Sequence, residues 1–207
     1  MAKLYFRYGT VSSAKTLNLL AVFHNYGQQG KKAILIKPKT DSRFGASVVK
    51  SRAGLSVEAD YVLPSNATFP VEALGGVHCV LVDEVQFFNE TFIEELRKIT
   101  CEYNIPVICY GLRTDFRTRS FEGSLRLMEL ADTVEEIKTT CSYCSKKAVF
   151  NLKIVGNLAV TDGPQIELGA EEKYQPTCAK CYSHKISECG DQIPRENEFT
   201  ENNQFVQ

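Results

Sequence analysis

The chain has 207 residues, which is enough for one medium domain with a small appendage but too few for two full-sized domains. Hydrophobic residues make up 43% of the sequence and charged residues 24%, so a buried core is expected and general disorder is not. The formal net charge of −1 at pH 7 argues against binding to nucleic acid or to a membrane surface, because both kinds of partner attract a positive field.

The first residues run directly into a strand-like pattern, without the charged and apolar segments of a signal peptide. No apolar run approaches the roughly 20 residues that a membrane-spanning helix needs. We therefore expect a cytoplasmic protein. In that compartment the eight cysteines are expected to be metal ligands or buried thiols, not disulfides.

Residues 1–138 alternate short apolar runs with segments of helical periodicity, which predicts an α/β fold with a parallel sheet flanked by helices. Strands are predicted over 4–8, 33–37, 61–63, 79–82, 107–110 and 133–137. Helices are predicted from about residue 15 to Gly27 or Gly30, from the cap Asn89 to about Ile99, and over 125–130. The polar stretch 38–54 between the second and third strands is predicted to be a loop or lid.

The pattern changes after residue 138. The short runs 148–155 and 158–161 are punctuated by glycines and cysteine pairs and have no helical periodicity, and the chain after Cys189 is polar. We therefore predict an α/β domain over 1–138, a small second domain over 139–190 and a disordered tail over 191–207.

A phosphate-binding loop is predicted between the first strand and the first helix. The segment Gly9-Thr10-Val11-Ser12-Ser13-Ala14-Lys15-Thr16 matches G-x-x-x-x-G-K-[ST], except that Ala14 replaces the second glycine. Backbone N–H groups would hold the phosphates of ATP, Lys15 would reach the β and γ oxygens, and the Thr16 hydroxyl would coordinate Mg²⁺. Alanine adopts a positive φ at a cost of about 1 kcal/mol, so the loop is expected to bind ATP. The alternative is a plain strand–turn–helix with a chance Lys-Thr pair.

Two carboxylates, Asp83 and Glu84, directly follow the apolar run Val80 to Val82. In P-loop folds an acid at this place positions Mg²⁺, which is the role predicted for Asp83. Glu84 could accept the proton of the attacking hydroxyl as a general base. The alternative is a solvated pair of acids that ends a strand.

Four cysteines form two C-x-x-C pairs, Cys141 with Cys144 and Cys178 with Cys181, separated by the 33 residues from 145 to 177. Four thiolates in two such pairs are typical of a closed, structural Zn²⁺ site. Free thiols or a redox pair are the alternative, and His184 and Cys189 lie close enough in sequence to be substitute ligands. The remaining residues of these types are interpreted as structural: Cys79, Cys101 and Cys109 as core packing, His24 and His78 without a metal role.

Together, the segment Gly9 to Thr16, the run Val82-Asp83-Glu84-Val85-Gln86-Phe87-Phe88, the segment Gly111 to Phe116 and the four cysteines closely resemble the cytosolic type (type II) of thymidine kinase. The likeness extends from Lys3 to about Tyr182. It implies a P-loop (RecA-like) ATP-binding domain over 1–138 and a zinc-binding, lasso-loop domain over 139–190. The implied reaction moves the γ-phosphate of ATP to the 5′-hydroxyl of thymidine, with deoxyuridine as a second candidate substrate, in nucleotide salvage for DNA synthesis.

The resemblance also assigns roles to individual residues. Lys15 and Thr16 match the phosphate and magnesium residues, Asp83 the metal-associated acid, and Glu84 the general base. Arg52 resembles the mobile-loop arginine that stabilises the phosphates. The expected nucleoside site consists of Phe87, Leu112 and Phe116 around thymine, with Phe116 stacking on the base, and of a lasso loop with Ile166, Glu167, Leu168, Gly169 and Tyr174.

Members of this family are usually homotetramers that thymidine triphosphate inhibits, so both properties are expected, with no nucleic-acid or membrane partner. Two residues depart from the family pattern: Ala14 in the phosphate loop, and Ala170 where relatives generally have glycine. Two other classes of protein combine similar motifs. A zinc-bearing adenylate kinase would have its cysteines inside the core, not after it, and a catalytically impaired P-loop and zinc-ribbon module with a binding or regulatory role would need a basic ribbon.

Overall fold

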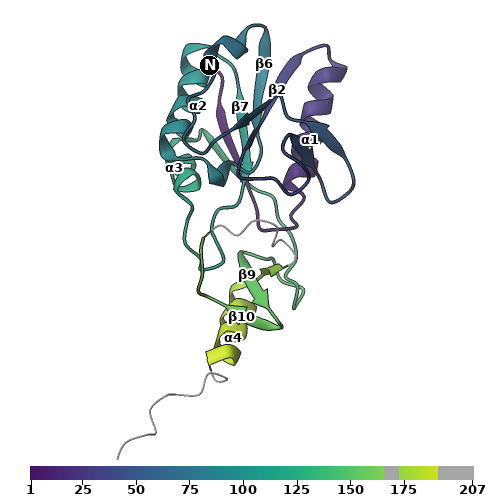
Figure 1. Ribbon diagram of the computed structural model, residues 1–207, viewed down its shortest axis with the longest axis vertical. Helices are drawn as coiled ribbons and strands as arrows, with labels where there is room; N and C mark the ends of the chain where they lie inside the picture. The colour runs from purple at the N-terminus through teal and green to yellow at the C-terminus, as the bar shows by residue number, and fades with distance from the viewer. Residues whose placement is uncertain (166–172, 191–207) are drawn as a thin grey trace, which may run out of the picture.

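The computed structural model describes residues 1–165 and 173–190, and for residues 189 and 190 it describes the backbone alone. It has two parts (Figure 1): a parallel sheet covered by helices, and a smaller antiparallel sheet with one helix, which lies below it in the view. In the part of the chain that is described, no helix is long and apolar enough to cross a membrane.

The large sheet has six parallel strands in the order β5-β2-β6-β7-β1-β8. Their bounds are Leu4–Tyr8 for β1, Lys32–Pro38 for β2, Tyr61–Leu63 for β5, Val77–Val82 for β6, Val107–Gly111 for β7 and Thr133–Glu136 for β8. Each strand predicted in this region is present. The predicted α/β fold with a parallel sheet is therefore confirmed.

Helices cover both faces of this sheet (Figure 1). Helix α1 runs over Lys15–Gln28, α2 over Glu90–Glu102 and α3 over Glu122–Leu130, with short 3₁₀ helices η1 at Val71–Leu74 and η2 at Val85–Phe87. The predicted cap of α2 is confirmed, because Asn89 Oδ1 accepts a hydrogen bond from the Phe92 backbone N–H at 3.0 Å.

Neighbouring strand residues pack on opposite faces, as the alternation of side chains along a strand requires. Under α2 and α3, one core contains Leu4, Phe6, Ile34, Ile36, Val80, Val82, Phe92, Ile93 and Leu96. Under α1, the other contains Leu19, Leu20, Leu35, Cys79, Leu81, Ile108 and Tyr110. The central strands are apolar on both faces, which explains their continuous hydrophobic runs.

The stretch 38–54 is not entirely irregular, contrary to the sequence prediction. Strand β3 (Val48–Lys50) pairs in antiparallel fashion with β4 (Ser56–Glu58). Val49 anchors this hairpin, because its side chain is buried in the core under α1. Three residues per strand were too few to show an alternating pattern in the sequence.

The smaller part contains a three-stranded antiparallel sheet, β10-β9-β11, formed by Phe150–Val155 (β9), Leu158–Val160 (β10) and Tyr174–Thr177 (β11). Helix α4 (Ala179–Gly190) follows, although the sequence analysis found no helical periodicity here. Contacts at its first turn fix this helix. The Tyr182 ring lies 5.3 Å from Phe150, and its hydroxyl donates to the Phe116 backbone oxygen at 2.6 Å.

The division of the chain at residue 138 stays a prediction, as does the tail 191–207, which lies outside the described residues.

Candidate active site

The carboxyl ends of β1, β6 and β7 are neighbours in the sheet, so the loops that follow them meet at one edge. In open parallel sheets this edge is where ligands bind. The loop after β1 carries the G-x-x-x-x-A-K-T segment, the loop after β6 carries Asp83 and Glu84, and the loop after β7 carries Leu112.

The loop after β1 has the backbone of a phosphate-binding loop. Ala14 has φ 63° and ψ 27°, in the left-handed region where glycine is favoured, and Ser12 has φ 60°. Gly9 is needed for space, because a Cβ atom there would lie 2.3 Å from Ser13 Oγ and 2.5 Å from the Ile137 backbone oxygen. Lys15 Nζ donates to the Thr10 backbone oxygen at 2.7 Å, so the loop curls around the amine. Burial lowers the pKa of Lys15 to about 8.

The loop also contains polar atoms that suit an anionic ligand. Among the described residues, the hydroxyl oxygens of Thr10 and Ser13 are buried and have no hydrogen-bond partner. Buried hydroxyls without partners are rare in native proteins, and such atoms point to a bound group. A phosphate at the start of α1 would supply acceptors for them.

Replacing Ala14 with glycine is expected to raise the unfolding free energy by less than about 2 kcal/mol. Relief of about 1–2 kcal/mol of left-handed strain is offset by the larger entropy of glycine in the unfolded chain, about 0.4–1 kcal/mol. Denaturant unfolding measures this difference, and calorimetry is expected to show a Kd for Mg-ATP within a few-fold of the wild-type value. Ala131→Gly is the matched control, because φ is −71° there and glycine should only destabilise. If neither the wild type nor Ala14→Gly binds Mg-ATP at millimolar concentration, the phosphate-loop assignment is wrong.

Asp83 and Glu84 lie at the carboxyl end of β6, and both are buried. Thr16 Oγ1 donates to Asp83 Oδ2 at 3.3 Å, which brings together the two residues predicted to bind Mg²⁺. Burial, together with repulsion from Glu84, raises the pKa of Asp83 to about 7. A carboxylate in this state favours a bound cation, because the cation would stabilise its ionised form.

The pKa of Glu84 is shifted in the opposite direction to that of Asp83. Burial acts to raise its pKa, but the positive charges of Arg43 and Lys15 and the hydrogen bonds from Gln86 and Arg43 outweigh this, so the pKa of Glu84 lies below its usual value. Its backbone is left-handed, with φ 46°. The side chain is therefore ionised at neutral pH and held at a fixed place, as a proton acceptor must be.

Arg43 is a site residue that the sequence analysis did not single out. Its Nη2 donates to Glu84 Oε1 at 2.6 Å, and its Nε donates to Asp41 Oδ1 at 2.5 Å. The neighbouring Lys37 has no exposed surface; its Nζ donates to the Val48 backbone oxygen at 2.9 Å and lies 3.6 Å from Asp41 Oδ2. These buried charges fix the segment 41–48 and direct Arg43 toward Glu84.

Arg52, the arginine that the resemblance indicated, contacts the phosphate loop. Its Nη1 donates to Ser12 Oγ at 2.9 Å. The predicted loop or lid therefore supplies two arginines, one at the proposed base and one at the phosphate loop.

Gln86 connects Glu84 with the loop after β7. Its Nε2 donates to Glu84 Oε2 at 2.6 Å, and its Oε1 accepts from the Leu112 backbone N–H at 3.0 Å. Gly111 leaves room for this amide, because a Cβ atom at that position would lie 2.5 Å from Gln86 Oε1. The D-E-x-Q-F-F run contains Gln86, but no pattern in the sequence indicated its role.

A cleft of about 400 Å³ brings many of the predicted site residues together. Its predicted members are Val11, Ser12, Ser13, Ala14, Lys15, Thr16, Arg52, Glu84 and Leu112. Arg43 is also part of its wall. Gly9 and Thr10 line a small adjoining pocket.

The predicted nucleoside residues are only partly placed together. The rings of Phe116 and Tyr174 lie 6.2 Å apart, and Lys153 Nζ lies 4.9 Å from the centre of the Phe116 ring. Phe87 instead packs edge-on against Phe121, with ring centres 6.1 Å apart, and does not line the cleft. The predicted contacts at Ile166, Glu167, Leu168 and Gly169, and the departure at Ala170, lie outside the described residues.

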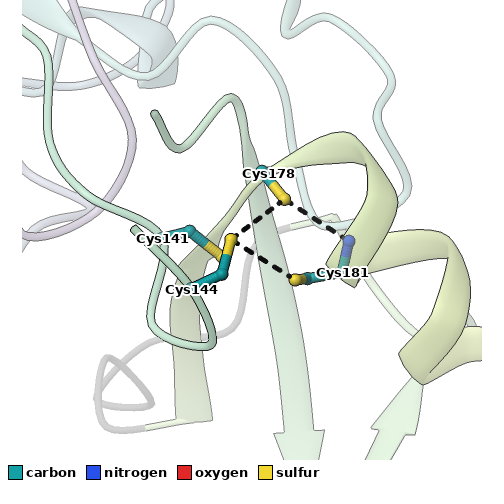
Figure 2. A group of neighbouring side chains, drawn as sticks. All are labelled: Cys141, Cys144, Cys178 and Cys181. Atoms are coloured by element: carbon teal, nitrogen blue, oxygen red, sulfur yellow. Dashed lines mark hydrogen bonds between the residues drawn. The ribbon is translucent and has the colours of Figure 1, made fainter. Parts of the chain in front are cut away.

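The four cysteines form a cluster in which all the sulfur atoms lie within 4.8 Å of one another (Figure 2). Cys144 Sγ lies 3.7 Å from the Sγ atoms of both Cys178 and Cys181. A tetrahedral site with Zn–S bonds of about 2.3 Å has sulfur atoms about 3.8 Å apart, so the observed spacing fits this geometry. Backbone N–H groups of Tyr143 and Cys181 point to Cys141 Sγ and Cys178 Sγ, both at 3.4 Å, and the latter contact lowers the pKa of Cys178. The cluster can hold a metal ion such as zinc.

Among the side chains that the structure describes, the cysteines outside the cluster show one difference from the sequence prediction. Cys79 and Cys109 are buried in the core, as predicted, but Cys101 is exposed because it lies on the solvent side of α2. His184 pairs with Glu188 at 3.1 Å. His78 Nδ1 accepts from the Lys32 backbone N–H at 3.2 Å.

Comparison with known proteins identifies the family. A family model described as Thymidine kinase matches residues 2–182. The thymidine kinase of Lactococcus lactis is 42% identical over 184 residues, which cover 88% of this chain and 97% of that protein. The thymidine kinase of Lactobacillus acidophilus is 41% identical over 194 residues, which cover 89% of this chain and 98% of that protein. A solved structure of Pif1 helicases on forked double-stranded DNA aligns with 65% of this chain and 39% of the helicase chain. The TM-score of this alignment is 0.40 and the sequence identity is 15%. The chain belongs to the thymidine kinase family.

Proposed function

We propose that the protein transfers the γ-phosphate of ATP to the 5′-hydroxyl of thymidine, with Glu84 as the general base. The observation that carries the proposal is the position of the Glu84 carboxylate. It lies in one cleft with the phosphate loop, two arginines and Leu112. A base between a phosphate site and an acceptor site is what in-line phosphoryl transfer requires.

At the ATP end, the phosphate loop holds the triphosphate, and Lys15 reaches the β and γ oxygens. The Thr16 hydroxyl and the Asp83 carboxylate would hold Mg²⁺, since both are oxygen ligands that suit this hard cation. Bound Mg²⁺ supplies positive charge to the phosphates. Arg52 contributes a further charge from the side of Ser12.

At the acceptor end, Glu84 takes the proton of the 5′-hydroxyl as the oxygen attacks the γ-phosphorus atom and the β–γ bridging oxygen leaves with ADP. Arg43 keeps the Glu84 carboxylate ionised and presents its guanidinium group to the cleft. The transferred group carries charge on three oxygens, so fixed positive groups around it stabilise the transition state.

The thymine base is proposed to stack on Phe116, with its methyl group near Val11 and Leu112 and with Tyr174 over the sugar. The short distance between the Phe116 and Tyr174 rings supports this arrangement. Contacts from the backbone at Ile166 to Gly169 and a contribution of Phe87 remain predictions.

Transfer of labelled phosphate from ATP to thymidine, deoxyuridine, deoxycytidine and deoxyguanosine tests the proposed function. Thymidine is expected to be the best acceptor and deoxyuridine the next, because both present the same base edge. Absence of transfer to every nucleoside, with Mg-ATP still bound, would instead support the binding or regulatory module.

Arg43→Ala is expected to lower kcat by about 10²- to 10³-fold, the usual effect of removing one preorganised donor from a charged transition state. Arg43→Lys should recover only part of this loss, because lysine cannot bond Asp41 and Glu84 with a planar group. Steady-state kinetics measure both variants. Arg126→Ala is the matched control, because within residues 1–165 and 173–190 the ion pairs of this arginine are with Glu94 and Glu129 on the helical surface. A kcat for Arg43→Ala equal to that of the control would remove Arg43 from the mechanism.

Three further properties are proposed on the basis of the family resemblance. The metal in the cysteine cluster is Zn²⁺, the protein is a homotetramer, and thymidine triphosphate inhibits it. Metal analysis, light scattering and inhibition kinetics test these proposals in turn.

A further inference from the structure

Asn151 connects the smaller sheet with both loops of the cleft. This residue lies on β9 and is 3% exposed. Its Oδ1 accepts a hydrogen bond from the Val11 backbone N–H at 2.8 Å, and its Nδ2 donates to the Thr114 backbone oxygen at 3.1 Å. One side chain therefore joins segments that lie 140 and 37 residues away in the sequence.

An amide at this place is unusual for a strand. Asparagine is depleted in strands, and burying its amide without partners costs about 1–3 kcal/mol. Both ends of the Asn151 amide are bonded, and each end bonds a different loop. The acceptor oxygen of the side chain thus bonds the phosphate loop, and its donor nitrogen bonds the loop after β7, which carries Leu112, Thr114 and Phe116 and is called the nucleoside loop below.

The two bonded residues lie next to the residues proposed to bind the substrates. Val11 lines the cleft within the phosphate loop, and Thr114 lies between Leu112 and Phe116. The strand ends below them are already joined, because the Gly9 backbone N–H donates to the Gly111 oxygen at 3.2 Å. Asn151 adds a second connection nearer to the cleft, so a shift of one loop carries over to the other.

We propose that Asn151 is a positioning residue that couples the ATP site to the nucleoside site, so that each ligand binds more tightly when the other is present. The proposal rests on the proposed roles of the two loops. Coupling between two sites is reciprocal and typically changes affinity by about 5- to 150-fold. Asn151 contacts neither substrate in this account and acts only through Val11 and Thr114.

The test measures the Kd of thymidine with and without saturating ADP, and the Kd of ADP with and without thymidine, on the full-length zinc-bound protein. The wild type is expected to show tighter binding of each ligand by at least about fivefold when the other is present. Asn151→Ala, which loses both hydrogen bonds, should bring this ratio close to one. Asn151→Asp keeps the acceptor for Val11 but not the donor to Thr114, so its Kd for thymidine should rise more than its Kd for ADP.

Thr177→Val is the matched control. Thr177 is fully buried on the adjacent strand β11, its hydroxyl donates to the Phe150 oxygen at 3.4 Å, and it bonds neither loop. Thermal unfolding and zinc content are measured for all variants. A merely structural role would lower the Tm of Asn151→Ala and Thr177→Val alike and leave the coupling ratio unchanged.

The outcomes separate this proposal from the proposed function. Retained coupling in Asn151→Asp or Asn151→Ala, or a wild-type ratio of one with both ligands bound, overturns the role of Asn151. If the wild type binds neither ADP nor thymidine, the assignment of the two loops fails as well. Asn151→Asp keeps the size of the side chain, so it serves as the test if Asn151→Ala does not fold.

Discussion

Replacing Glu84 with glutamine is expected to lower kcat by about two to four orders of magnitude, with Mg-ATP binding changed by no more than a few-fold. General-base catalysis is typically worth about 10²- to 10⁴-fold, and glutamine has nearly the same shape but cannot take a proton. Its amide oxygen can still accept one hydrogen bond from Arg43 or Gln86, which bond the carboxylate at 2.6 Å. Steady-state kinetics with thymidine give kcat, and calorimetry gives the Kd of Mg-ATP.

Two companion variants make the Glu84 result specific. Glu94→Gln changes a carboxylate on the surface of α2 that pairs with Arg126, and its kcat should match the wild type. Asp83→Asn should instead weaken Mg-ATP binding, because Asp83 is the proposed magnesium ligand next to Thr16. A kcat for Glu84→Gln close to the wild-type value would show that another group, or water, removes the proton.

Replacing Cys178 with serine is expected to abolish stoichiometric zinc binding and to unfold the smaller part of the protein. Three short strands and one helix enclose few large apolar side chains, so the cluster must provide much of their stability. In zinc-finger peptides at pH 7, binding of structural zinc contributes roughly 10–16 kcal/mol of folding free energy. Loss of this part also removes the Asn151 hydrogen bond to the Val11 backbone and the contact of Tyr174 with Phe116, so thymidine binding should be lost with the metal.

Metal analysis and thermal unfolding check this prediction, with thymidine binding as the functional measurement. The wild type should contain one zinc ion per chain, and Cys178→Ser close to none. Cys101→Ser is the matched control, because this exposed cysteine lies outside the cluster and its loss should change neither zinc content nor Tm. Unchanged unfolding of Cys178→Ser would mean that the four thiols have no role in stability.

Features that repeat along the chain could be predicted from the sequence. The six strands of the large sheet follow from apolar runs that are buried on both faces, and Asn89 marks the start of α2 through its own side chain. The phosphate loop and the cysteine quartet were also visible, because their chemistry depends on residues close in sequence. Even the substitution at Ala14 could be interpreted in advance, since a left-handed backbone tolerates alanine at a modest cost.

Other features depend on which segments the fold brings together, and only the tertiary structure decided them. Arg43 reaches Glu84 across 41 residues and Asn151 reaches Val11 across 140, and neither pair has a local pattern. The position of Cys101 on the exposed side of α2, the packing of Phe87 against Phe121, and helix α4 were decided in the same way. The periodicity of a sequence indicates which face of a helix or strand is buried and which is exposed to solvent. The partners of a polar side chain depend instead on the order of the strands in the sheet and on the course of the loops. For this reason the sequence indicated the phosphate loop, the acids Asp83 and Glu84 after β6, and the cysteine cluster. The structure identified Arg43, Gln86 and Asn151, which connect the segments of the site.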